Sequence, residues 1–137
     1  LDEEAKAGLP LGRPLSPAQV ADFDAEVAAA HCGHAPEKVL AMMRPAQVLK
    51  DASMARALSA DTAILIAGNG HTRTDRGVPH YLERPSLTVS FLEVHDEGVE
   101  PADYLAQGPA DYLWFTPAVD DEDPCEKFRQ QLEKMGE

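Results

Sequence analysis

Long hydrophobic runs are absent from this 137-residue sequence. No stretch approaches the roughly 20 apolar residues of a membrane-spanning helix, and residues 1–12 lack the basic-then-apolar pattern of a signal peptide. The composition, 44% hydrophobic and 26% charged, excludes collagen-like, coiled-coil and disordered chains and suits one compact domain. Because the chain begins at Leu1 and not at a methionine, we expect an upstream segment in the full protein, and these residues do not define the localisation.

Basic residues are scarce, with 12 Lys and Arg against 24 Asp and Glu, a net charge of −12. Residues 93–126 hold eleven acidic residues and no Lys or Arg. Such a surface repels phosphate backbones, which argues against a nucleic-acid partner. Between Lys38 and Arg84 the balance reverses, with seven basic residues against four acidic ones, so an anionic ligand is expected there.

Cysteine is equally scarce. Cys32 and Cys125 form no CxxC pattern, which supports neither a disulfide framework nor a zinc cluster. Two interpretations stay open: a single Cys32–Cys125 bridge, or, more simply, two small half-buried residues. The nucleotide-binding patterns GxxxxGK[ST] and GxGxxG and the hydrolase pattern GxSxG are missing, and the acidic run 120–123 lacks the DxDxDG ladder of a calcium loop.

The first half of the chain has helical periodicity. Ser16 and Pro17 predict the start of a helix that runs to about residue 30 and ends at Gly33. A second helix is predicted from Glu37, and Pro45 predicts a kink or a break in it. Its predicted core-facing stripe, in which the methionines simply fill the core, is Val39, Met42, Met43, Ala46, Leu49, Met54, Ala57 and Leu58.

The second half of the chain alternates between strand and helix patterns. Residues 62–67 (TAILIA) predict a central strand buried on both faces, and residues 87–92 and 112–116 predict two more strands. Helical segments are predicted at 75–82, 101–106 and 124–135, the last capped by Asp123.

The predicted fold class is therefore α/β, a mainly parallel small sheet with flanking helices and a helical hairpin cap. Residues 1–15 are a predicted frayed lead-in or linker, and residues 16–137 a single α/β domain fragment. Within it, residues 16–60 form the helical cap and residues 61–137 the part that forms the sheet.

The segment Gly68-Asn69-Gly70-His71 follows the predicted central strand, at the end where open α/β sheets place ligand sites. Its glycines are expected to permit a tight turn and close approach of a ligand. His71 is a candidate metal or haem ligand or a general base, with Asn69 as a neutral donor beside it. The alternative is an ordinary strand-to-helix turn. Three charged residues that follow are candidates for binding carboxylates or orienting the histidine: Arg73, Asp75 and Arg76.

A second cluster, His31-Cys32-Gly33-His34, offers imidazole and thiol ligands for a metal. The simpler interpretation is that His31 lies in the last turn of a helix, where the dipole favours a cation, and that Gly33 ends this helix. Tyrosines matter if the ligand is haem, because a phenolate can bind ferric iron. Tyr81 is the best candidate because it lies just beyond GNGH, whereas Tyr112 is predicted to pack in the core and Tyr104 is a further alternative.

Residues 64–82, ILIAGNGHTRTDRGVPHYL, resemble the ChaN-like haem-binding family, in which a hydrophobic strand runs into GNGH and then into D-x-G-V-P-x-Y-L. Two further stretches are similar to that family, so that the resemblance covers nearly everything from Ser16 onward. One is the helical region, with Ala30-His31-Cys32-Gly33, Pro36, Ala46-Gln47, Lys50-Asp51 and Met54-Ala55. The other is the C-terminal part, with Tyr112-Leu113-Trp114-Phe115-Thr116-Pro117 and Asp121-Glu122-Asp123-Pro124-Cys125.

The resemblance implies a bacterial protein of iron or haem uptake that is periplasmic or a membrane-anchored lipoprotein. It also implies a homodimer that binds haem and an outer-membrane haem receptor as a partner. The wider superfamily includes erythromycin esterase-like proteins and Tiki-type metal-dependent proteases, whose sites use two GxxH motifs and a glutamate. One GxxH is present here, so the other is expected upstream of Leu1, and the chain looks like the C-terminal half of a domain. Pro45 and Lys50 depart from the family pattern.

The leading hypothesis is a haem-binding protein, which favours a binding role over an enzymatic one. Haem would lie against the helical cap and the carboxyl ends of the strands, with His71, Tyr81, His31 or His34 as ligand and with Arg73 and Arg76 among the residues near the propionates. The alternative is a metal-dependent hydrolase that binds zinc or manganese through His71 and upstream residues. A third interpretation is a structural α/β fragment without activity of its own.

Overall fold

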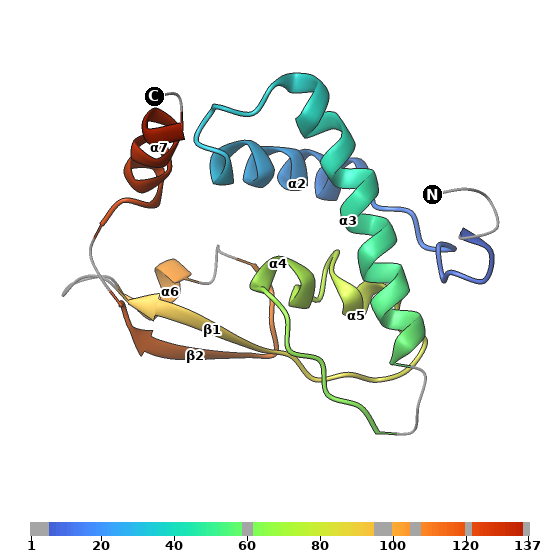
Figure 1. The fold of residues 1–137 in the computed structure, drawn as a ribbon. Helices are drawn as coiled ribbons and strands as arrows, with labels where there is room; N and C mark the ends of the chain where they lie inside the picture. The colour runs from blue at the N-terminus through green and yellow to red at the C-terminus, as the bar shows by residue number, and fades with distance from the viewer. Residues whose placement is uncertain (1–5, 59–61, 95–99, 105–107, 120–121, 136–137) are drawn as a thin grey trace.

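The structure is a computed structural model that describes residues 6–58, 62–94, 100–104, 108–119 and 122–135. Figure 1 shows α2 and α3 on one side, the two strands on the other, and the short helices α4 and α5 between them. The predicted α/β class with a small parallel sheet is confirmed. The element order is α2 (Pro17–Ala30), α3 (Glu37–Ala57), α4 (Asn69–Thr72), α5 (Val78–Tyr81), β1 (Val89–Val94), α6 (Pro101–Tyr104), β2 (Tyr112–Pro117) and α7 (Pro124–Met135).

Helix α2 begins and ends as its sequence predicts. The Ser16 hydroxyl accepts a hydrogen bond from the backbone N–H of Gln19, and the Gln19 side chain accepts one from the backbone N–H of Ser16. This capping box satisfies N–H groups that have no partner inside the helix. After Ala30 the chain turns through two residues in the left-handed region, Cys32 and Gly33, with φ of 54° and 71°.

Helix α3 is continuous from Glu37 to Ala57, so the predicted break at Pro45 is wrong. Proline removes one intrahelical hydrogen bond, the one that the carbonyl of Ala41 would accept. Both residues are exposed, so water can replace the missing donor there. The long helix therefore passes through the proline.

The predicted core-facing stripe of α3 is right at its C-terminal end, where Met54 and Leu58 pack against the core cluster, and wrong at its N-terminal end. Met42 is 58% exposed, whereas the buried residues of the helix are Asp51, Ala52 and Ala55. Small alanine side chains let α5 approach α3 closely, and Ala52 and Ala55 form the core cluster together with Val78 and Tyr81 of α5. The alanines of α3 therefore make the central contact with α5, and larger apolar residues such as Met54 pack around it.

The apolar segment 62–67 is not the buried central strand that its composition predicts. It is extended but pairs with no strand among the described residues, and Ile64 and Ile66 are 87% and 94% exposed. A strand is buried on both faces only when other elements cover both faces. The described parts of the chain do not provide that cover.

The other two predicted strands pair in parallel as β1 and β2, in a register that places Val89 opposite Tyr112. Asp111 fixes the start of the pair, because its carboxylate accepts hydrogen bonds from the backbone N–H and the hydroxyl of Thr88, at 2.7 and 2.9 Å. The short helix α6 lies between the strands in sequence, as predicted, although residues 105–107 fall outside the described residues.

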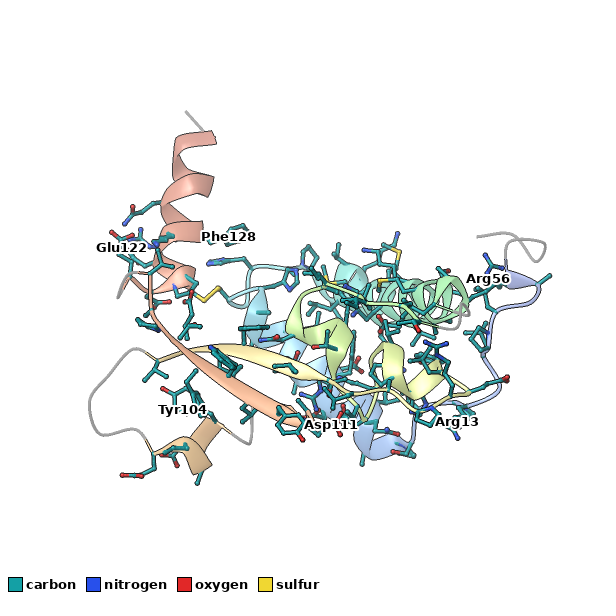
Figure 2. The ribbon with its side chains drawn as sticks, turned by 90° about the horizontal axis from the view of Figure 1, so that it is seen from below. Arg13, Arg56, Tyr104, Asp111, Glu122 and Phe128 are labelled. Carbon is teal, nitrogen blue, oxygen red and sulfur yellow. A yellow bond between two sulfur atoms is a disulfide. The ribbon has the colours of Figure 1, made fainter. Side chains whose placement is uncertain are left out.

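The C-terminal helix α7 matches its prediction in both bounds, and the Asp123 carboxylate accepts a hydrogen bond from the backbone N–H of Cys125. Cys32 and Cys125, 93 residues apart in sequence, form a disulfide. Of the two interpretations that the sequence left open, the bridge is thus the correct one. Figure 2 shows this bond joining α7, near Phe128, to the turn between α2 and α3.

The described part of the lead-in, residues 6–15, packs on the domain. Leu9 and Leu11 contact the core cluster. The backbone carbonyl of Arg13 lies 3.1 Å from Nε2 of His80, and the Arg13 guanidinium donates to the His80 carbonyl at 3.4 Å. The described part of residues 1–15 is therefore attached to the helix that follows the GNGH segment.

Candidate functional site

His71 lies on α4, a single helical turn where the sequence predicted a loop. The turn is attached to the sheet by Asn69, whose side-chain amide donates a hydrogen bond to the carbonyl of Phe91 in β1 at 2.9 Å. This hydrogen bond holds α4 against β1, and the role of Asn69 as a donor beside the histidine stays a prediction. His71 is consequently carried by a turn that is hydrogen-bonded to both β1 and α3.

The glycines around His71 have different roles. Gly68 has a φ of −63°, and a Cβ at Gly68 or Gly70 would meet nothing within 4 Å, so the predicted need for a tight glycine turn is not found there. These two glycines leave open space beside the histidine. Gly77 is the constrained one, because a Cβ there would lie 2.3 Å from the carbonyl oxygen of His71 and 2.8 Å from that of Arg73.

Two side chains of α3 hold the His71 ring. Nδ1 of His71 lies 2.6 Å from Oδ1 of Asp51 and 2.8 Å from the amide nitrogen of Gln47. Gln47 and Asp51 are four residues apart, so both project from the same face of the helix. Nε2 of His71 has no hydrogen-bond partner among the described residues, and the side chain is 26% exposed.

Asp51 is a fully buried carboxyl group, with 0% exposure. Burial raises its pKa to about 6, although the hydrogen bond and charge of His71 and the hydrogen bond from Gln47 act in the opposite direction. Its second oxygen, Oδ2, is buried without a hydrogen-bond partner. Burial of a carboxyl group lowers the free energy of unfolding unless the group is hydrogen-bonded. The hydrogen bond of Asp51 is made to His71.

Tyr81 lies behind this pair in the core. It is 3% exposed, and its hydroxyl is buried without a hydrogen-bond partner. Burial raises the pKa of Tyr81, and the charge of Asp51 raises it further. Both effects disfavour the phenolate form that binds ferric iron. Tyr81 as a haem ligand stays a prediction, and in this structure its hydroxyl points into the protein core.

Two hollows adjoin His71. One, of about 640 Å³, runs along α3 and is lined by His71 together with five residues of that helix: Ala46, Leu49, Lys50, Ser53 and Met54. The other, of about 370 Å³, lies toward β1 and is lined by His71, Ile64, Leu65, Val78 and neighbouring residues. Both volumes fall within the roughly 300–1,000 Å³ of ligand pockets. The hollow along α3 is mainly apolar and carries a single cation, Lys50.

Arg73 and Arg76 are structural in this arrangement. Both are buried, at 7% and 3% exposure, and both form ion pairs with Asp22 and Glu26 of α2. Arg73 also donates two hydrogen bonds to Asp75, at 2.9 and 2.7 Å. The two arginines thus hold α2 against the GNGH turn, and their role near haem propionates stays a prediction.

His31 and His34 lie elsewhere, at the turn between α2 and α3. Nδ1 of His31 lies 2.7 Å from the carbonyl of Val27 in its own helix, as the simpler interpretation of this cluster predicted. The ring of His34 packs against that of Phe128 in α7, with ring centroids 6.2 Å apart. No described contact links either residue to His71, and within the described residues no group of three or more His, Cys, Asp and Glu could hold a metal ion.

Sequence reasoning missed Asp51 and Gln47 as site residues. A signal was available, because an acidic residue at position 51 lies between two apolar positions, Leu49 and Ala52, on a helix that packs on the core. A charge on a packed helix face needs a partner. The partner, however, is 20 residues away in sequence and only the fold brings it near.

Comparison with protein families gives a match. The family model described as haem-binding uptake, Tiki superfamily, ChaN, matches residues 1–82, which is more than half of the 137 residues. The match includes α2, α3, the GNGH turn and α5, and it ends before β1. No curated protein and no solved structure matches the chain. Within the described residues no helix is long and apolar enough to cross a membrane. The chain therefore belongs to the ChaN family of haem-binding uptake proteins in the Tiki superfamily.

Proposed function

We propose that this protein binds haem as cargo in bacterial iron uptake, with Nε2 of His71 as the axial ligand to the iron. One observation carries the proposal. The histidine is held through Nδ1 by a buried carboxyl group while Nε2 has no described partner, beside an apolar hollow. Histidine is a common axial ligand of haem iron, and a second hydrogen bond on the far nitrogen is typical of ligating histidines.

The residues of the hollow along α3 suit a porphyrin. Leu49 and Met54 offer apolar surface for the ring, and Lys50 at the same hollow offers a cation for a propionate. Arg73 and Arg76 are already paired with carboxylates, so Lys50 is the better propionate partner. The donor set and the polarity of the hollow are thus compatible with haem.

The proposal extends to compartment and assembly. We place the protein in the periplasm or on a membrane as a lipoprotein, and the Cys32–Cys125 bridge supports this because disulfides persist in oxidising compartments. We further propose a homodimer, with an outer-membrane haem receptor as a partner. Exposed Ile64 and Ile66 support a covering partner, since exposed apolar patches are typical of association surfaces.

A haemin titration followed by visible absorbance and by size in solution tests the proposal. We expect saturable binding with a defined Soret band and dimer formation. His71→Ala should weaken binding strongly, whereas His34→Ala, a matched histidine at the turn between α2 and α3, should leave it unchanged.

Three outcomes would contradict this assignment. Unchanged binding by His71→Ala would remove His71 from the site. Loss of binding in His34→Ala alone would move the ligand to the other histidine cluster. Stoichiometric zinc or manganese without a Soret band would favour the metal-dependent hydrolase, for which the described residues offer no group of three or more His, Cys, Asp and Glu as ligands.

A further inference from the structure

Two hydrogen-bonding groups approach one nitrogen of His71. Oδ1 of Asp51 lies 2.6 Å from Nδ1, and the amide nitrogen of Gln47 lies 2.8 Å from it. A neutral imidazole has one N–H and one bare nitrogen, and an amide NH₂ can only donate. Nδ1 therefore cannot donate to Asp51 and accept from Gln47 in the same state.

Two arrangements satisfy this limit. In the first, Nδ1–H of His71 donates to the ionised carboxylate of Asp51 across the 2.6 Å contact, and the Gln47 amide donates nothing to Nδ1. In the second, Gln47 donates to a bare Nδ1 and Asp51 must be protonated, which leaves the proton on Nε2. The first arrangement gives the buried carboxylate a donor at 2.6 Å, and buried polar groups are nearly always hydrogen-bonded.

We infer that Asp51 is a positioning residue that keeps the proton of His71 on Nδ1 and so leaves the lone pair of Nε2 free. The inference rests on the proposed function for its consequence, because only a bare Nε2 can bind iron. Its structural core, the tautomer of the ring, does not depend on any ligand. The same logic governs histidines whose orientation is fixed by a carboxylate elsewhere in proteins.

Nitrogen NMR on isotopically labelled protein without haem tests the tautomer directly. The His71 signals are identified by their loss in His71→Ala. At about pH 8, above the ordinary titration range of histidine and carboxylates, we expect a protonated Nδ1 and a bare Nε2. A protonated Nε2 in the unmodified protein would overturn the inference, whatever the variants do.

Asp51→Asn provides the second arm, because asparagine keeps the size of the side chain and replaces one of the two acceptor oxygens by an NH₂ donor. We expect the proton to move to Nε2 and haemin affinity to fall about 10- to 100-fold. Glu37→Gln, which neutralises an exposed carboxylate on the same helix, should change neither signal nor affinity. An unchanged tautomer in folded Asp51→Asn would also overturn the inference.

The two proposals fail in distinguishable ways. In one case the tautomer responds to Asp51→Asn while His71→Ala still binds haemin normally. The proposed ligand is then wrong, and so is the proposed effect of Asp51 on haem ligation. If His71→Ala loses binding while the unmodified protein has the proton on Nε2, the haem site stands and the positioning role of Asp51 is wrong.

Discussion

Two histidine clusters look alike in this sequence, each with a glycine directly before a histidine, and the fold treats them differently. His31 bonds to a carbonyl of its own helix, four residues back. His71 lies against a buried carboxyl group from a helix 20 residues earlier. The partner of His31 is local, so the contact only completes the end of a helix. The partner of His71 is distant in sequence and buried, so the contact fixes the role of Nδ1. The difference between the clusters lies in where the partner comes from.

The largest effect is expected at the first cluster, from removal of the disulfide. The bridge closes a loop of 93 residues, and in the chain-entropy model its loss by Cys32→Ser with Cys125→Ser lowers the free energy of unfolding by about 4–5 kcal/mol. Denaturant unfolding measures this. In conditions where the double variant stays folded, the His71 tautomer should be unchanged. A changed tautomer would show that the two clusters are coupled, which would break the comparison.

The next largest effect is expected at Gly77, which supports the second cluster. A Cβ there would lie 2.3 Å from the carbonyl oxygen of His71, so Gly77→Ala forces the backbone apart and should lower the free energy of unfolding by about 3 kcal/mol. Gly70→Ala is the matched control. It meets nothing within 4 Å and lies inside α4, so it should be neutral or stabilise by about 1 kcal/mol. Equal stability of the two variants would refute the packing argument.

The smallest effect is expected from Tyr81→Phe. The lost hydroxyl is buried and has no hydrogen-bond partner, so its removal should change the free energy of unfolding by less than about 1 kcal/mol. If His71 is the axial ligand, the haem absorption bands of this variant should match those of the unmodified protein. Shifted ligand-to-metal bands would instead identify Tyr81 as the ligand. The function of the GNGH cluster would then depend on Tyr81 and not on His71.

Local signals predicted helices well and burial poorly. Ser16 and Pro17 correctly marked the start of α2, and the alternating pattern near residue 90 correctly predicted a strand, because caps and period depend on neighbouring residues only. Composition misled at Ile64 and Met42, which are apolar but exposed. The apolar character of a side chain indicates how much free energy its burial would contribute. Whether other elements cover that side chain depends on the rest of the fold.

The candidate site follows the same division. The family, the GNGH motif and His71 were predicted from sequence, and the match to the haem-binding uptake family confirms the first of these. The partners of the histidine were not predicted, because Asp51 and Gln47 come from another helix. Arg73 and Arg76 pair with acids of α2 that no local pattern links to them, and their role near haem propionates stays a prediction.

By itself, the sequence determined where α2, α3 and α7 lie, which residue types could bind an iron porphyrin and to which family the chain belongs. These depend on side-chain chemistry and on short spacings along the chain. Only the tertiary structure decided that one cysteine pair is bonded, that Tyr81 points into the core and that a buried carboxyl group holds His71. Such contacts join residues distant in sequence, and the protonation and orientation of each group depend on the neighbours that packing places around it.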